Sequence, residues 1–387
     1  MNVTKVPRPI LSVCILLFGL PLYAAIPQAW YSSTPTNKNL TAAFYGQGQY
    51  IVVGWGSMII KSPSGFSWTQ AMQLPGPPGS GSPDHFFSAA YGNGMFVAGG
   101  QQNMLLAISP DAIHWTNIFS TIGTEQLYGL TFANGRFVGV GRGSPGYGQD
   151  SYIITSTNGT DWRGPSVKPT MNILYGVAYG NGVYVAVGDL GTILTSPDGS
   201  NWTLHSCGTT RKLRAVTFTG SRFLAGGEAA TMLTSTDGVS WSPAAPPAFD
   251  VTGLASGGGA VVAVGDYNGT DGRLHASSDG LGWPGNPTLV SQPLNGVAYA
   301  NDRFIALGNN GLILQSDVSN PGNPTLTYSR TPGGLQLSWD WNGSELLGST
   351  NVAGPYLRLD PQPQSPYAVN CTEPRRFFIL SGPPLLP

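Results

Sequence analysis

Charged residues are scarce in this chain, and lysines most of all. Asp, Glu, Lys and Arg make up 10% of the 387 residues, against roughly 25% in an ordinary soluble protein. Only five residues are lysines, and the formal net charge is −1. A nucleic-acid-binding surface needs clustered Lys and Arg to neutralise phosphates. Nucleic acid is therefore not an expected partner.

Cysteine and histidine are also rare, with three and four residues. Cys207 and Cys371 lie beyond the N-terminal leader and far apart, so they form no disulfide framework. The sequence favours two free thiols over a bridge between domains. Neither the cysteines nor the scattered histidines have metal-ligand spacing. No P-loop or dinucleotide-binding fingerprint stands between a strand and a helix. We therefore expect no metal and no cofactor.

Long apolar runs are absent after residue 25, so no membrane-spanning segment is expected there. Residues 1–25 have the features of a signal peptide. Lys5 and Arg8 form a positive start, and Ile10–Leu20 is an apolar core too short to span a bilayer. Ala24 and Ala25 then supply small residues for cleavage. We expect an exported protein, located in the periplasm, at the cell surface or outside the cell.

Glycine, by contrast, is abundant, with 54 residues, and aromatic residues reach 11%. The chain consists largely of seven copies of one unit, best seen from Gly176 to Thr203. Each copy has an anchor residue, and successive anchors lie 38 to 47 residues apart, the length of one four-stranded propeller blade. The anchors are Tyr45, Tyr91, Phe132, Tyr179, Phe218, Ser256 and Tyr299. The sequence therefore predicts an all-β, seven-bladed propeller over residues 26–320.

A glycine stands nine residues after every anchor. These seven positions, which we call the glycine column, are Gly54, Gly100, Gly141, Gly188, Gly227, Gly265 and Gly308. The anchor ends the first strand of a blade, and an Asn-Gly-type hairpin turn leads into the second strand. That strand is apolar on both faces, as a strand packed between neighbouring blades must be.

A second hairpin, with Ser and Trp six residues apart, occurs in six copies; we call these the Ser-to-Trp hairpins. The Asp or Asn at the third position can accept backbone N–H bonds within the turn, and the Trp packs between sheets. A carboxylate repeated in this way is structural rather than catalytic. The residues with this structural role are Trp68, Asp111, Trp115, Asn158, Trp162, Asp198, Trp202, Asp237, Trp241, Asp279 and Trp283.

The Ser-to-Trp hairpin resembles the Asp-box (BNR) repeat of sialidase-like propellers. The longer frame is similar to the propellers of photosystem II assembly factors and their many bacterial relatives. The resemblance covers residues from about 29 to 320 and implies the same fold. In Asp-box enzymes that have an active site, the hairpins lie on the opposite face. The resemblance therefore implies a functional surface on the side away from the hairpins.

The seventh copy has no Trp six residues after Ser316; Gly322 stands there instead. Its outer strand must come from elsewhere, because an open ring leaves two unpaired strand edges. Trp30 lies in a short strand-like segment just before the first copy. We predict that this segment completes the seventh blade.

Residues 321–387 are predicted to form a linker and a small β-sandwich-like module. The repeat ends at Ser319–Pro324, which is rich in turn residues. Apolar residues then alternate over 335–341, which indicates a half-exposed strand. Ser349–Tyr356 and Thr372–Phe378 resemble parts of a fibronectin-III-like module found at the end of many secreted bacterial proteins. That resemblance implies attachment or domain spacing.

The two ends of a propeller blade differ in what they present. The first-to-second turns and the Ser-to-Trp hairpins share one face, the hairpin face. The second-to-third turns and the segments leading into each blade form the other, which we call the mouth face. Residues there differ from copy to copy, as a recognition surface requires. We expect seven of them to surround the mouth of the central channel: Trp55, Tyr128, Arg142, Asp189, Arg214, Glu228 and Asp266.

Three functions remain open. The favoured hypothesis is a monomeric, non-catalytic binding or scaffold propeller that recognises a protein or a glycan through the mouth face. The alternative is a carbohydrate-active hydrolase or lyase, which would place two carboxylates roughly 5–9.5 Å apart at the channel mouth. A structural or adhesive surface protein is the third. A typical sialidase is not expected, because its three-arginine cluster and Arg-Ile-Pro-type motif are not recognisable.

Overall fold

The computed structural model describes residues 27, 30–73, 84–101, 105–119, 126–143, 151–164, 169–267 and 269–316, and six short strands between 327 and 381. The predicted signal peptide, the predicted linker, Cys371 and most of the loop after Arg142 lie outside the described residues. The chain divides into two compact units, of which one is Ala24–Asn320 and the other includes Pro321–Pro387. In the described part of the chain, no helix is long and apolar enough to cross a membrane.

The first unit is a seven-bladed propeller of antiparallel sheets, as the repeat predicts. Blades 1 to 3 contain β2 (Leu40–Gly46), β3 (Gln49–Gly54), β4 (Met58–Ser62) and β5 (Thr69–Gln73); β6 (Phe86–Gly92), β7 (Met95–Gly100), β8 (Leu105–Ser109) and β9 (Thr116–Phe119); and β10 (Gln126–Ala133), β11 (Arg136–Arg142) and β12 (Ser151–Ser156).

Blades 4 to 6 contain β13 (Leu174–Gly180), β14 (Val183–Gly188), β15 (Ile193–Ser196) and β16 (Thr203–His205); β17 (Leu213–Phe218), β18 (Phe223–Gly227), β19 (Met232–Ser235) and β20 (Ser242–Pro243); and β21 (Asp250–Gly257), β22 (Ala260–Tyr267), β23 (Asp271–Ser277) and β24 (Thr288–Val290). Blade 7 contains β25 (Leu294–Ala300), β26 (Arg303–Gly308), β27 (Ile313–Ser316) and β1 (Trp30–Ser33). Two single 3-10 turns, η1 (Asp189–Gly191) and η2 (Asn309–Gly311), follow β14 and β26.

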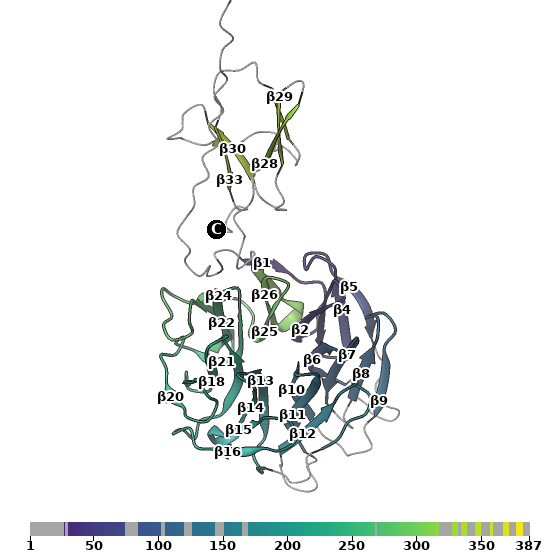
Figure 1. Ribbon diagram of the computed structural model, residues 1–387, viewed down its shortest axis with the longest axis vertical. Coiled ribbons are helices and arrows are strands. Elements are labelled where there is room, and N and C mark those ends of the chain that lie inside the picture. The colour runs from purple at the N-terminus through teal and green to yellow at the C-terminus, as the bar shows by residue number, and fades with distance from the viewer. Residues whose placement is uncertain are drawn as a thin grey trace, which may run out of the picture. The chain divides into compact units, whose positions relative to one another are not determined.

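The innermost strands form a closed ring, in which each contacts the next and β25 contacts β2. Figure 1 shows the blades arranged around this axis in chain order, from purple to green. Each of the seven interfaces between blades holds its own cluster of buried apolar residues. The second strands supply an aromatic column that is fully buried: Tyr50, Phe96, Phe137, Tyr184, Phe223 and Phe304, with Val261 in blade 6.

The glycine column has a steric cause. A Cβ atom at Gly188 would lie 2.1 Å from the carbonyl oxygen of Ile173, the residue before the innermost strand of the same blade. At Gly265 the corresponding distance, to Asp250, is 1.8 Å. At each of the seven glycines, an added Cβ atom would lie 2.8 Å or less from the equivalent carbonyl oxygen. Such a contact with rigid backbone excludes any side chain, so the residue is invariant because of close approach.

A β-bulge follows this contact in every blade. In β2, the register shifts between Leu40 and Ala42, which leaves Thr41 as the extra residue. A bulge redirects a side chain that regular pleating would place elsewhere. The seven bulge residues are Thr41, Phe87, Tyr128, Tyr175, Arg214, Thr252 and Asn295. The fold thus repeats one backbone irregularity seven times at the mouth face and varies only its side chain.

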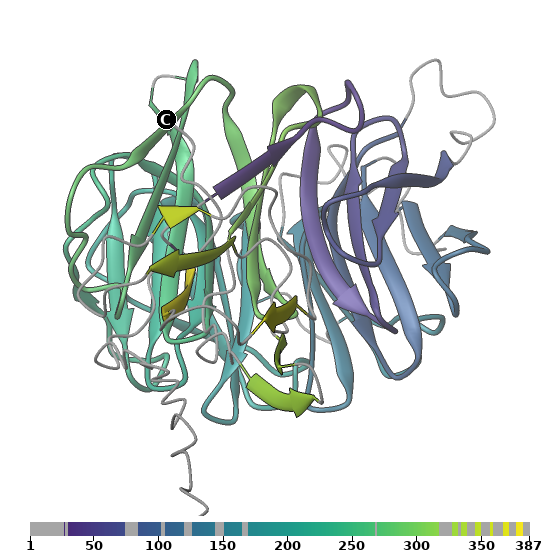
Figure 2. The same cartoon turned by 90° about the horizontal axis from the view of Figure 1, so that it is seen from above.

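Strand β1 is the outer strand of blade 7. It pairs antiparallel with β27, and Trp30 stands opposite Ser316. The half-buried Trp30 packs on the apolar cluster between blades 6 and 7, which includes Phe304 and Leu314. In Figure 2 the purple strand β1 lies against the green strands of this blade. The N-terminal end of the propeller is therefore hydrogen-bonded to its C-terminal end, and the ring has no open edge between them.

The Ser-to-Trp hairpins of blades 3, 4 and 5 share one full set of hydrogen bonds. In blade 4, Asp198 Oδ1 accepts bonds from the backbone N–H groups of Ser200 and Asn201, both at 2.8 Å, and Ser196 Oγ accepts from Gly199 N–H at 2.8 Å. The Trp202 indole N–H donates to the Gly199 carbonyl at 3.0 Å. These bonds pair the polar groups of the turn with one another.

Acid should weaken these turns. The backbone bonds hold the pKa of Asp198 well below its usual range, and the pKa values of Asp111, Asp237 and Asp279 are also lowered. A lowered folded-state pKa contributes stability above the unfolded pKa of about 4, and that contribution is lost as the pH falls through the folded pKa. We expect the free energy of unfolding to fall with pH below about 4.

Asp198→Asn tests this cause. Asn158 performs the same role in blade 3, where its Oδ1 accepts from two backbone N–H groups at 3.0 and 2.9 Å. The variant should therefore cost less than about 1 kcal/mol at pH 7 and flatten the acid dependence measured by denaturant unfolding. An acid dependence identical to that of the parent would show that this carboxylate does not contribute.

The second unit is also β-structure. Its described strands form two three-stranded antiparallel sheets. One contains β28 (Thr327–Thr331), β29 (Gly334–Ser338) and β32 (Tyr367–Asn370), and the other contains β30 (Glu345–Ser349), β31 (Leu357–Arg358) and β33 (Phe377–Ser381).

Candidate functional site

Three columns of residues meet at the mouth face. Two are the bulge residues and the residues after the glycine column, both of which vary along the repeat as the sequence shows. The third is the residue whose carbonyl group meets the glycine column: Asn39, His85, Gln126, Ile173, Lys212, Asp250 and Pro293. This third column also varies, and it stands six residues before each anchor. It was missed by the sequence prediction, although its spacing is as regular as that of the others.

A run of aromatic side chains crosses blades 1 to 4 on this face. Ring centroids of Trp55 and His85 lie 4.6 Å apart, those of His85 and Phe87 6.5 Å, those of Phe87 and Tyr128 5.3 Å, and those of Tyr128 and Tyr175 5.3 Å. We call these five residues the aromatic arc. The bulges in three consecutive blades place neighbouring rings in contact, so the arc is a rigid apolar surface.

Trp55 begins the arc and is the most exposed of the predicted aromatic residues, at 42%. It stacks on His85 with an angle of 11° between the rings. His85 is held by its Nδ1, which accepts from Gly56 N–H at 3.1 Å, and by a β-bridge to Trp55. The indole thus caps blade 1 against blade 2 and also presents a fixed, open face to solvent.

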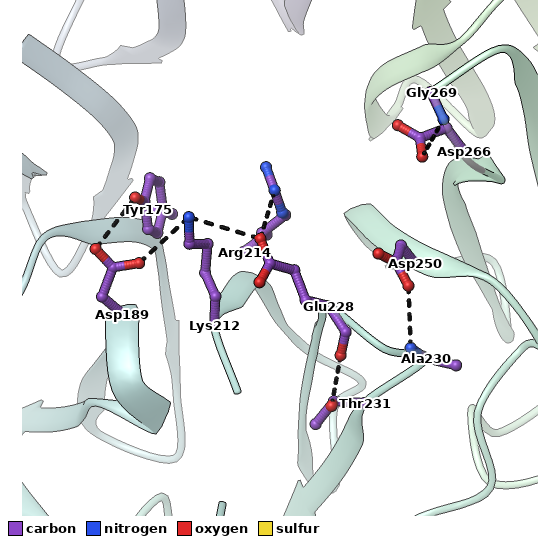
Figure 3. Close-up of polar contacts among 10 residues, drawn as sticks. All are labelled: Tyr175, Asp189, Lys212, Arg214, Glu228, Ala230, Thr231, Asp250, Asp266 and Gly269. Carbon is purple, nitrogen blue, oxygen red and sulfur yellow. Dashed lines mark hydrogen bonds and ion pairs between the residues drawn. The ribbon is translucent and has the colours of Figure 1, made fainter. Parts of the chain in front are cut away.

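The arc ends at a charged cluster from blades 4 and 5. Lys212 Nζ lies 5.3 Å from the Tyr175 ring centroid, 3.5 Å from Asp189 Oδ1 and 3.6 Å from Glu228 Oε1. Arg214 Nη2 donates to the same Glu228 oxygen at 2.8 Å. Figure 3 shows these side chains converging from η1 and from the ends of β17 and β18, with Asp189 and Glu228 on either side of the lysine.

Two tyrosines of the arc serve as hydrogen-bond donors. Burial raises the pKa of Tyr175, and the negative charge of Asp189 raises it further. Its hydroxyl group donates to Asp189 Oδ2 at 3.3 Å. Burial also raises the pKa of Tyr128, although the neighbouring Arg142 opposes this rise. Both phenols therefore stay protonated at neutral pH, and Tyr128 donates to the side chain of Gln126.

The other three bulge residues have a structural role. Their polar groups donate to carbonyl groups at the start of the next blade, which fastens consecutive blades together. These bonds run from Thr41, Thr252 and Asn295 to Phe86, Leu294 and Leu40, at 2.8, 2.8 and 2.9 Å. In blades 2 to 5, the bulge position holds an aromatic or charged residue in place of these polar ones. The mouth face therefore has two regions. Aromatic and charged bulge residues occupy blades 2 to 5, and polar bulge residues that join consecutive blades occupy blades 1, 6 and 7.

Six of the seven predicted rim residues belong to the aromatic arc, contact it, or lie in the charged cluster at its end. Asp189, Arg214 and Glu228 are brought together through Lys212. Tyr128 lies against Arg142, Trp55 joins the arc through His85, and Asp266 stands apart. Among the described residues, Asp266 Oδ1 accepts a local bond, from Gly269 N–H at 3.3 Å. The residues that make these connections, His85 and Lys212, both belong to the missed column.

Chemically, the mouth face offers stacking surfaces, phenol donors and mixed charges. The described residues contain no group of three His, Cys, Asp or Glu side chains that could hold a metal ion. Cys207 is a free, buried thiol whose Sγ lies 3.0 Å from the Gly191 carbonyl oxygen, behind this face. The described arrangement is suited to recognition by contact.

Known structures share this fold. The chain is 17% identical to YCF48 from Cyanidioschyzon merolae, covering 76% of this chain and all of that one, with a TM-score of 0.57. A structure of YCF48 bound to D1 peptide also shows 17% identity, with 80% and 99% coverage and a TM-score of 0.58. Virginiamycin B lyase from Staphylococcus aureus is 10% identical, with 74% and 98% coverage and a TM-score of 0.60. No protein-family profile and no curated protein matches the chain in sequence. At these identities the likeness establishes the propeller fold.

Proposed function

We propose that this protein is an exported, monomeric, non-catalytic propeller that binds a protein segment or a glycan on its mouth face. The observation that carries the proposal is the aromatic arc, which ends in an exposed indole at one side and a charged cluster at the other. Fixed aromatic and arginine side chains are the residue types that dominate binding energies. The similar propeller YCF48, bound to D1 peptide, shows that this fold can hold a peptide.

Trp55→Ala and Arg142→Ala should each weaken binding about tenfold, the loss of roughly 1.4 kcal/mol expected for a contact residue. A glycan array and a phage-displayed random-peptide library serve as probes, and affinities are then measured for the probes that the parent protein selects. The melting temperature should stay within about 1 °C, because an exposed indole contributes little to the core.

Val239→Ser is the matched control, since Val239 is an exposed apolar residue in a Ser-to-Trp hairpin, on the hairpin face. It should bind every selected probe as the parent does. If this substitution abolishes binding while both mouth-face variants bind normally, the binding surface has been assigned to the wrong side. A protein that retains no probe from either collection would instead support an adhesive or purely structural role.

A carbohydrate-active hydrolase or lyase is the second candidate, and one observation favours it. Asp189 and Glu228 both lie within 3.6 Å of one ammonium group, so their separation is below the roughly 9.5 Å limit of a catalytic pair. However, Lys212 stands between them and pairs with both. We expect no release of reducing ends or unsaturated sugars from polysaccharide substrates. Turnover that Glu228→Gln abolishes would reverse this choice.

The identities of the Ser-to-Trp hairpins and of the second unit belong to the same proposal. The internal bonding of the Ser-to-Trp hairpins supports their identity as Asp boxes, whose role is to hold the blades. The two small sheets of the second unit support a fibronectin-III-like module that attaches or spaces the propeller. Neither assignment requires a further chemical function.

A further inference from the structure

The turns after β14 and β26 have one geometry. In both, the N–H group of the fourth residue donates to the carbonyl oxygen of the first. The bonds run from Thr192 to Asp189 at 3.0 Å and from Leu312 to Asn309 at 3.1 Å. The central residues have φ/ψ of 54°/32° at Leu190 and 52°/34° at Asn310. A glycine with positive φ follows in each. The two turns differ in the central side chain, so each is a control for the other.

This left-handed conformation suits asparagine and is unfavourable for leucine. Asn310 is well placed, since its Nδ2 donates to Gln292 Oε1 at 2.8 Å. Leu190 gains no such bond, and 66% of it is exposed to solvent. The described second-to-third turns in blades 1 and 5 place Gly, Ser or Ala at positive φ. A strained backbone that displays an apolar side chain to water points to a use for that side chain.

A second exposed apolar residue belongs to the same blade. Met171, 60% exposed, lies in the segment that leads into β13. The next residue, Asn172, donates from Nδ2 to Thr192 Oγ1 at 2.7 Å, which joins this segment to the η1 turn. Leu190 and Met171 are therefore carried by two loops that are fastened to each other. Single exposed apolar residues need no explanation, whereas two on joined loops of one blade are the candidate apolar contacts for a ligand.

Charged residues line the mouth face from blade 4 to blade 6. Figure 3 draws the carboxylates of Asp189, Glu228, Asp250 and Asp266 with two cations, of which Lys212 pairs with Asp189 and Glu228, and Arg214 pairs with Glu228. No Lys or Arg of the described residues pairs with Asp250 or Asp266. These two carboxylates also stand directly opposite each other in the pairing of β21 with β22. Like charges in that position destabilise a sheet, and an added cation would relieve them.

We infer that the mouth face over blades 4 to 6 binds a segment of a partner protein that carries both an apolar side chain and a lysine or arginine. The inference rests on the proposed function and takes a protein segment, rather than a glycan, as the ligand. Aliphatic and thioether side chains such as Leu190 and Met171 pack against apolar side chains, whereas sugar rings stack on aromatic faces. Asp250 and Asp266, which accept backbone N–H bonds but have no ion-pair partner among the described residues, would then pair with the basic residue of the segment.

The test uses the full chain and a phage-displayed random-peptide library. Peptides selected by the parent protein should contain both an apolar residue and a Lys or Arg. Leu190→Asn should bind the selected peptides at least about tenfold more weakly while its melting temperature rises by roughly 1–3 °C. Asp250→Asn should weaken binding and reduce its dependence on salt. The reverse swap, Asn310→Leu, should lower the melting temperature and leave the affinity unchanged.

The outcomes separate this inference from the proposed function. If peptides are selected but the Leu190→Asn variant holds them as tightly as the parent, the inference is wrong and the proposed function stands, provided that Trp55→Ala still weakens binding. Selection of acidic peptides, or binding on a glycan array alone, also overturns the inference. The absence of binding to peptides and glycans alike overturns both.

Discussion

Gly188→Ala is expected to lower the free energy of unfolding by about 3 kcal/mol or more. The added methyl group would lie 2.1 Å from the Ile173 carbonyl oxygen and 3.0 Å from its carbon. Both atoms belong to backbone that bonds Asp189 N–H and leads into the innermost strand. Overpacking against flexible side chains already costs about 1–3 kcal/mol, and backbone cannot rotate away. Denaturant unfolding measures the change.

Gly282→Ala is the matched control. Gly282 has no heavy atom within 4 Å of its would-be Cβ and no positive φ. Its substitution should change the free energy of unfolding by less than about 1 kcal/mol, since only the entropy of the unfolded chain changes. Equal losses at the two positions would mean that the glycine column serves chain flexibility rather than close approach.

Trp30→Ala is the second substitution with a large expected effect, a loss of about 2–4 kcal/mol. The indole packs on the cluster between blades 6 and 7, and truncation of large buried side chains costs amounts of this order. It also anchors β1, whose pairing with β27 joins the two ends of the ring. Loss of this strand would expose the edge of β27. We expect a lower melting temperature with the unfolding transition still cooperative.

Trp55→Ala provides the comparison for Trp30→Ala, because it removes the same side chain from an exposed site. Its effect on stability should stay below about 1 kcal/mol. If the Trp30 substitution is as mild as the Trp55 substitution, closure of the ring depends on the backbone pairing of β1 and not on its indole. Deletion of residues 30–33 would then be the change that opens the ring.

The mouth face and the rest of the propeller follow different rules. Elsewhere, repeated positions carry repeated residues, because each blade interface must be filled in the same way. On the mouth face, a left-handed leucine at position 190 and two opposed carboxylates at 250 and 266 are locally unfavourable. Binding surfaces commonly reduce stability in this way. The same reasoning explains why Leu190→Asn should raise the melting temperature.

The sequence by itself determined the fold. The spacing of the anchors, the glycine column and the Ser-to-Trp hairpins predicted seven four-stranded blades and the side of the propeller that varies. A sequence repeat predicts the fold well because each blade must make the same contacts with its neighbours. Blade 3 departs from this pattern, since its described sheet has three strands and its outer position holds only the bridge of Thr155 with Arg163.

Only the tertiary structure decided which variable residues act together. The sequence placed Trp55, Asp189, Arg214 and Glu228 on one face but could not show that His85 and Lys212 connect them. Those contacts arise because the ring places the end of one blade beside the start of the next, Trp55 beside His85 and Asp189 beside Lys212. Spacing along the chain specifies the place of each residue within a blade, whereas contact across the channel mouth depends on how the blades close around their axis.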